Sequence, residues 1–153
     1  TFLMTNMIPQ SPDCNRIVWK DLEAFERDLA EQGKELYVAA GPYGKGGQSG
    51  SGTFDTIPVK SKKGAGKEIL VPSHCWKIVV IMDDADNDFA RISTDTEILA
   101  VFMPNKQGIH KTGSWDQYLV SVDEIEAKTG YDFLANIPDE IENIIEAKVY
   151  KKW

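Results

Sequence analysis

Side chains that could do chemistry recur at steps of four residues near the start of the chain: Asn15, Trp19, Glu23 and Arg27. At the α-helical advance of about 100° per residue, one side of this stretch would carry three cations and one carboxylate: Arg16, Lys20, Glu23 and Arg27. Clustered cations are typical of surfaces that bind phosphate groups. The spacing therefore predicts a helix with a phosphate-binding side.

The same residues also have a purely structural interpretation. Glu23 and Arg27 could form an ordinary exposed ion pair one turn apart, which contributes only tenths of a kcal/mol. Asn15 could be the N-cap of the helix, because Asn is among the best residues for that position. Trp19 could belong to the core. Periodicity alone favours this second interpretation.

Asn15, Trp19, Glu23 and Arg27 are called the ladder below. The helix that must position it is predicted by the apolar residues of the same stretch: Val18, Leu22, Phe25 and Leu29. They follow one another at the spacing of an amphipathic helix, which should end at Gly33.

Several segments downstream predict a sheet. "ELYVAAG" predicts a buried strand, and "GPYGKGGQSGSG" predicts a long, mobile glycine-rich loop. The apolar runs "HCWKIVVIM" and "EILAVFMP" predict paired central strands. "YLVSV" alternates as a strand does.

Two more helices are predicted toward the end of the chain. Ser121 and Glu124 form a capping-box pattern in front of "VDEIEAKTG". Pro138 precedes "DEIENIIEAKVY", whose acidic residues lie in the first turn, as the helix dipole prefers. Because helices and strands do not alternate regularly, the sequence predicts one α+β domain over residues 1–153.

Composition narrows the class of protein. A chain of 153 residues with 42% hydrophobic and 27% charged residues is ordinary for a soluble globular domain. No apolar run approaches the roughly 20 residues of a membrane span, so no membrane partner is expected. The net charge of -7 would repel nucleic acid at long range, although local charge can override it. Cys14 and Cys75 are expected to be buried free thiols.

The residue pattern of the predicted first helix and of the segment before it resembles that of a known family. "TFLMTNMIPQSPDCNRIVWKDLEAFER" is similar to the DNA/RNA non-specific endonucleases of the ββα-metal type, which include endonuclease G and sugar-non-specific bacterial nucleases. The matching positions are Thr5, Asn6, Pro9, Gln10, Asn15, Trp19, Leu22, Glu23 and Arg27. The resemblance continues through later blocks and covers almost the whole chain.

The resemblance implies a fold, a cofactor and roles. It implies a ββα-metal nuclease fold with a mostly antiparallel central sheet flanked by helices, of which residues 1–153 are the C-terminal portion of the catalytic domain. Asn15 matches the single direct protein ligand of a magnesium or manganese ion, a hard cation that suits an amide oxygen. Glu23 matches the carboxylate that orients metal-bound water, and Arg27 the cation that steadies charge on the phosphate.

Binding roles follow from the same resemblance and from the cationic stripe. Asn6 and Gln10 match polar residues that support the site, and Arg16 is expected to contact the substrate together with them. DNA and RNA are the implied partners, and a protein inhibitor is a further candidate partner. Secretion or a periplasmic location is an expectation taken from the bacterial relatives.

One part of the family pattern is absent from these residues. The family's general base is a His in an Asp-Arg-Gly-His motif, and the sequence contains no such motif. His74 and His110 lack that context, so both are expected to be ordinary structural or surface residues. The chain could be one piece of a cleaved nuclease, a shortened nuclease, or a degenerate member that does not cut.

The retained Asn15, Glu23 and Arg27 favour the first two alternatives. The predicted function is a metal-dependent, sugar-non-specific endonuclease whose general base comes from a missing or separate N-terminal segment. The alternative is an inactive nuclease-like module that binds nucleic acid or a protein partner. The acidic linker "DDADND" is not expected to be a dedicated calcium loop, because Phe89 stands where Gly is required.

Overall fold

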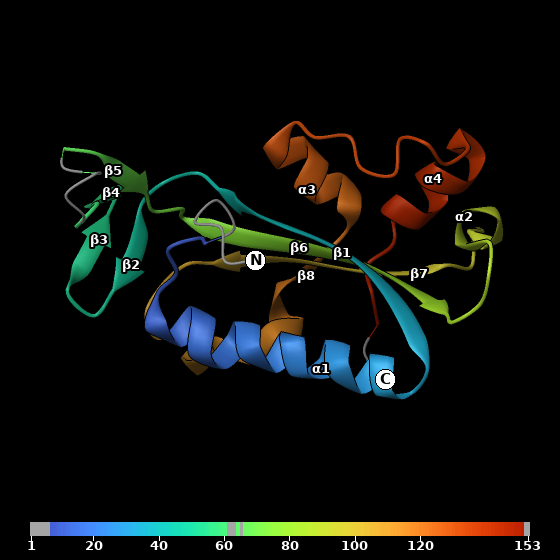
Figure 1. Ribbon diagram of the computed structural model, residues 1–153, viewed down its shortest axis with the longest axis horizontal. Coiled ribbons are helices and arrows are strands. Elements are labelled where there is room, and N and C mark those ends of the chain that lie inside the picture. Colours follow the sequence, from blue (N-terminus) through green and yellow to red (C-terminus); the bar gives the residue numbers. More distant parts are fainter. Residues whose placement is uncertain (1–6, 61–63, 65, 152–153) are drawn as a thin grey trace.

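The computed structural model describes residues 7–60, 64 and 66–151, and its centre is a four-stranded antiparallel sheet (Figure 1). The strands lie in the order β1 (Lys34–Tyr43), β6 (His74–Asp83), β7 (Glu97–Pro104) and β8 (Leu119–Val120). Val79 of β6 pairs with Val38 on one side and with Leu99 on the other. The two apolar runs are therefore paired central strands, as predicted.

Helices cover both faces of this sheet (Figure 1). One face carries η2 (Cys14–Trp19) and α1 (Lys20–Glu31), and the other carries α3 (Val122–Thr129) and α4 (Asp139–Glu146). Successive side chains of a strand point to opposite faces. Val79 and Ile81 accordingly pack in the core with the first helix, whereas Ile78 and Val80 pack with α3 and α4. The predicted α+β class with a flanked antiparallel sheet is confirmed.

The first helix has the predicted apolar face and end. Val18 and Leu22 are fully buried, and Phe25 and Leu29 pack against the same core cluster. Gly33 follows the helix with a φ of 83°, a left-handed conformation that Gly adopts at little cost.

The last two helices begin as predicted, but α4 ends early. Ser121 Oγ accepts a hydrogen bond from the backbone N–H of Glu124 at 3.1 Å, which confirms its capping role. The sequence predicted that the last helix continues to Tyr150, yet α4 ends at Glu146. Tyr150 instead packs beside Phe25 on the other face of the sheet, so the chain must leave the helix to cross over.

Three other predictions need correction. β1 is not buried: it is an edge strand whose Tyr37 and Val38 are 46% and 50% exposed. The glycine-rich segment is no structureless loop, because it forms the hairpin of β2 (Gly47–Ser49) and β3 (Gly52–Phe54). A Cβ atom on Gly47 would lie 2.6 Å from Asn105 Nδ2, so this hairpin requires glycine where it contacts the sheet. The predicted strand "YLVSV" shortens to the two residues of β8.

The remaining elements are short. β4 (Thr56–Pro58) pairs with β5 (Glu68–Leu70), while α2 (Asp88–Arg91), η4 (Ile109–Thr112) and η5 (Trp115–Tyr118) connect the longer elements. Over the part of the chain that the structure describes, no helix has the length and apolar character needed to cross a membrane.

Both cysteines are buried free thiols, as predicted. Burial raises the pKa of Cys14 to about 12 and that of Cys75 to about 11.

Candidate active site

A hollow of about 700 Å³ lies where the first helix meets β1 and β6. Its polar lining comes from three ladder residues, one residue of the segment before the helix and one strand residue: Asn15, Trp19, Glu23, Gln10 and Lys77. The rest of the lining is apolar or a thiol: Met7, Ile8, Val38, Ala40, Pro42 and Cys75. The hollow thus places an amide, a carboxylate and an indole within one concave site.

The pitch of the first helix explains why the ladder faces one way. Residues Cys14–Trp19 form a π-helix, whereas Lys20–Glu31 form an α-helix. In an α-helix a step of four residues overshoots a full turn by about 40°. In the wider π-helix the same step falls short of a full turn. The two drifts oppose each other, so Asn15, Trp19 and Glu23 stay on one side.

Gln10 and Asn15 are joined directly. Asn15 Nδ2 donates to Gln10 Oε1 at 2.7 Å. The described residues provide no donor to Asn15 Oδ1, which leaves this amide oxygen available to a ligand. Asn15 lies inside the π-helix, whose N-cap is Asp13, so the N-cap interpretation of Asn15 is wrong.

A buried asparagine anchors the segment that carries Gln10. Asn105 is 1% exposed, and its Oδ1 accepts from the backbone N–H of Ser11 at 2.6 Å. Its Nδ2 donates to the carbonyls of Pro9 and Pro72. Sequence reasoning missed this residue, because the contact joins segments 94 positions apart.

Trp19 fixes the carboxylate of the site. Its Nε1–H donates to Glu23 Oε1 at 3.0 Å, and Lys77 Nζ lies 4.6 Å from the centre of its ring. Lys77 is held by Glu26, whose two carboxylate oxygens accept at 2.8 and 3.1 Å. Glu23 therefore has an internal partner and, of the described contacts, no salt bridge with Arg27.

Lys77 is a further residue that the sequence did not single out. It is 4% exposed and stands in the apolar strand "HCWKIVVIM". A lysine in such a run was the available signal, since a buried cation needs a partner.

The other predicted residues fall outside the hollow. Arg16 and Arg27 are exposed and do not line it. Arg16 lies in the π-helix, whereas Glu23 and Arg27 lie in the α-helix. The shared side predicted for these three residues assumed one uniform α-helix, so the change of pitch turns Arg16 away from the other two. Asn6 lies outside the described residues.

Neither histidine lines the hollow. His74 stacks on Phe102 with ring centres 4.7 Å apart, and its pKa is lowered by burial and then by Lys128 and Lys106. His110 Nδ1 lies 3.1 Å from Asp13 Oδ2. Both contacts are structural ones.

The family model for DNA/RNA non-specific endonuclease matches residues 1–140. The chain belongs to this endonuclease family. A nuclease of Nostoc sp. is 44% identical over 149 residues, which is 97% of this chain and 48% of the relative. A nuclease of Serratia marcescens is 28% identical over 95% of this chain and 47% of its own length. Human mitochondrial endonuclease G is 28% identical over 90% of this chain and 42% of its own length.

The family member described here spans about half the length of the curated relatives it matches. The matched region includes the whole first helix and the sheet, and so contains every polar residue that lines the hollow.

Proposed function

We propose that this chain carries the metal-binding half of a sugar-non-specific endonuclease that hydrolyses phosphodiester bonds in DNA and RNA. The observation that supports this most directly is the convergence of Gln10, Asn15, Trp19 and Glu23 on one hollow. The proposed architecture is the ββα-metal nuclease fold, with η2 and α1 as its helix.

The donor set fits a magnesium or manganese ion. Asn15 is exposed at the hollow and offers Oδ1, a neutral oxygen without a described donor. A hard divalent cation that keeps most of its waters needs few protein ligands. When bound, such an ion supplies charge stabilisation for a phosphate and its leaving oxygen.

The proposed roles of the other residues follow from their contacts. Gln10 accepts from Asn15 Nδ2 and so turns Asn15 Oδ1 toward the ligand. Glu23, held by Trp19, orients water in the hollow through its second carboxylate oxygen. Arg27, exposed on α1, steadies the charge that develops on the scissile phosphate, and Arg16, exposed on η2, contacts the phosphate backbone of the substrate. Asn6 keeps its proposed supporting role.

The general base is proposed to come from a segment with the Asp-Arg-Gly-His motif outside residues 1–153. β1 offers a place for such a segment. Of the described strands only β6 pairs with it, and Val38, 50% exposed on β1, lines the hollow. An unpaired edge of ten residues favours the addition of a strand. A protein inhibitor and a secreted or periplasmic location remain proposals on family grounds.

The decisive experiment pairs intact mass under denaturing conditions with plasmid nicking, with and without magnesium. A second polypeptide with Asp-Arg-Gly-His and metal-dependent nicking are the expected results. In that sample Asn15→Ala should reduce nicking at least a hundredfold, because the metal loses its protein ligand. Asn143→Ala, an exposed asparagine of α4, is the matched control and should cut normally.

Two outcomes would overturn the proposal. Nicking that is unchanged in Asn15→Ala would remove the metal assignment. A sample shown to contain the motif-bearing polypeptide but unable to nick would leave a module that only binds.

A further inference from the structure

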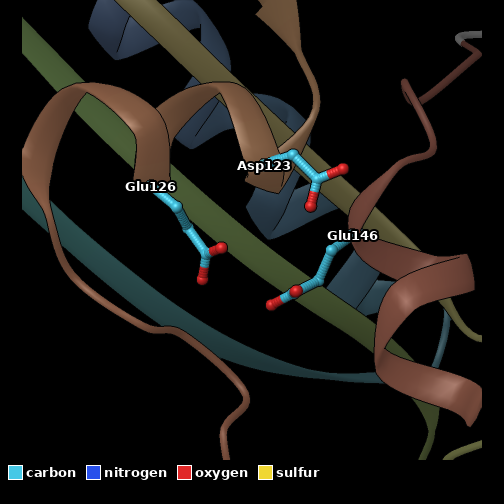
Figure 2. A group of neighbouring side chains, drawn as sticks. All are labelled: Asp123, Glu126 and Glu146. Carbon is cyan, nitrogen blue, oxygen red and sulfur yellow. The ribbon is translucent and has the colours of Figure 1, made fainter. Parts of the chain in front are cut away.

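Three carboxylates converge on the face of the sheet opposite the hollow. Asp123 and Glu126 come from α3, and Glu146 is the last residue of α4. Their ligand oxygens all lie within 4.8 Å of one another. Figure 2 shows the three side chains pointing into the same space between the two helices.

Glu146 is the unusual member of this group. It is 5% exposed, and its Oε1 is buried without a hydrogen-bond donor among the described residues. A buried carboxylate normally has a hydrogen-bond or charge partner, because removing it from water is costly. Its carboxylate points toward those of Asp123 and Glu126, an arrangement that a cation would stabilise (Figure 2).

The surroundings supply no side-chain cation. Within the described ranges, none of the three carboxylates takes part in a salt bridge. Glu146 also ends α4, where the helix carbonyls disfavour a negative charge. Burial, followed by Glu126, Glu142, Asp123 and Asp132, raises the pKa of Glu146 to about 8.

Glu126 is already fixed in place for a ligand. Its Oε1 accepts from the backbone N–H of Phe133 at 2.6 Å. This bond ties the loop after α3 to the side chain and leaves Glu126 Oε2 for another partner.

We propose that Asp123, Glu126 and Glu146 form a divalent-cation site, selective for calcium, that ties α4 to α3. Calcium takes carboxylate oxygens at 2.3–2.6 Å, so two ligands of one ion lie at most about 5 Å apart, and the group meets this limit. Magnesium, with bonds near 2.1 Å, demands a nearly ideal octahedron and gives up its waters reluctantly, so a group of carboxylates from two helices suits the more flexible coordination of calcium better. The site is independent of the proposed nuclease function.

The test is calorimetric titration of the full chain with CaCl2, supported by thermal unfolding with and without calcium. The wild type should bind one calcium ion per chain at this site, at least tenfold more tightly than magnesium, and calcium should raise its Tm. Glu146→Gln should weaken calcium binding at least tenfold and abolish the rise in Tm. Glutamine resembles the protonated carboxyl, so this variant is expected to fold.

Controls separate this site from others. Glu140→Gln, an exposed residue of the same helix, should bind calcium as the wild type does. Asp123→Asn changes an exposed ligand and decides the question if Glu146→Gln fails to fold. Wild-type protein that binds no calcium at millimolar concentrations, or unchanged affinity in the folded ligand variants, would overturn the proposal.

Discussion

Trp19 connects two polar residues of the hollow, Glu23 and Lys77, through a single side chain. Its indole N–H holds Glu23, and its ring lies under the ammonium of Lys77. Lys77 is in turn held by Glu26, so the orientation of Glu23 depends on a chain of contacts that reaches the central strand. A tryptophan in this position is therefore a positioning residue as well as a packing one.

At this scale we predict that Trp19→Phe lowers turnover about tenfold or more with little change in KM. The variant keeps the ring but loses the N–H donor to a charged group, a bond that contributes about 1.5–3 kcal/mol. Nicking rates at several substrate concentrations separate kcat from KM. Trp76→Phe is the matched control, because the buried Trp76 Nε1 has no hydrogen-bond partner among residues 7–60, 64 and 66–151. Equal losses of turnover in both variants would contradict the positioning role.

At the scale of elements, the space between α3 and α4 contains three neighbouring carboxylates, those of Asp123, Glu126 and Glu146. Glu146 has a raised pKa of about 8, against an ordinary value of 4.5. Between these values the unfolded chain has released the proton and the folded chain still binds it. The folded state therefore loses stability as the pH rises through this window, and the loss is complete above the folded pKa.

We predict that wild type and Glu146→Gln diverge in this window when divalent cations are removed by chelation. From about pH 5 to about pH 9, the free energy of unfolding of the wild type should fall by roughly 2–4 kcal/mol relative to the variant. Denaturant titrations at several pH values measure this difference. The four acidic neighbours of Glu146 are present in both proteins, so the comparison isolates the substitution at Glu146: Asp123, Glu126, Glu142 and Asp132. A difference that stays constant with pH would contradict the prediction.

At the scale of the whole molecule, the two cores on either side of the sheet share its central strands. Cys14 is 0% exposed and Cys75 is 1% exposed, and burial raises the pKa of both thiols. Near neutral pH both thiols are therefore shielded from solvent and protonated in the folded chain. Their modification therefore reports opening of the core.

We predict that neither thiol of the folded chain reacts with a disulfide reagent at about pH 8, since a thiolate is the reactive form. In concentrated guanidinium chloride both should react within minutes. Absorbance of the released thiolate counts the thiols. Rapid reaction of one thiol in the native protein would show that the hollow admits solvent to Cys75.

The sequence predicted much of this architecture because the relevant signals are local. Apolar runs located β6 and β7, and spacing located the face of η2 and α1 that carries Val18 and Leu22. The match to the family pattern also predicted that Gln10, Asn15 and Glu23 belong to one site. These features depend on residues within a few turns of one another or on a continuous motif.

The missed features depend on contacts between distant segments. The exposure of β1 depends on which strand ends the sheet, and the partners of Lys77 and Asn105 come from elsewhere in the chain. The acidic group joins α3 to Glu146, twenty or more positions away. The π-helix could not be predicted from the spacing of the polar residues, because a step of four residues is close to one turn in both an α-helix and a π-helix.

The π-turn has a consequence for how this chain can change over evolutionary time. Substitutions leave the number of residues between Asn15 and Glu23 intact, but loss of one residue between them would let the turn relax to an ordinary α-helix. Asn15 and Glu23 would then lie seven positions apart, and seven α-helical steps of about 100° again bring them to nearly the same side. A deletion can therefore remove the π-turn without separating the two residues, whereas an α-helix that keeps all the residues would turn Asn15 about 80° away from Glu23.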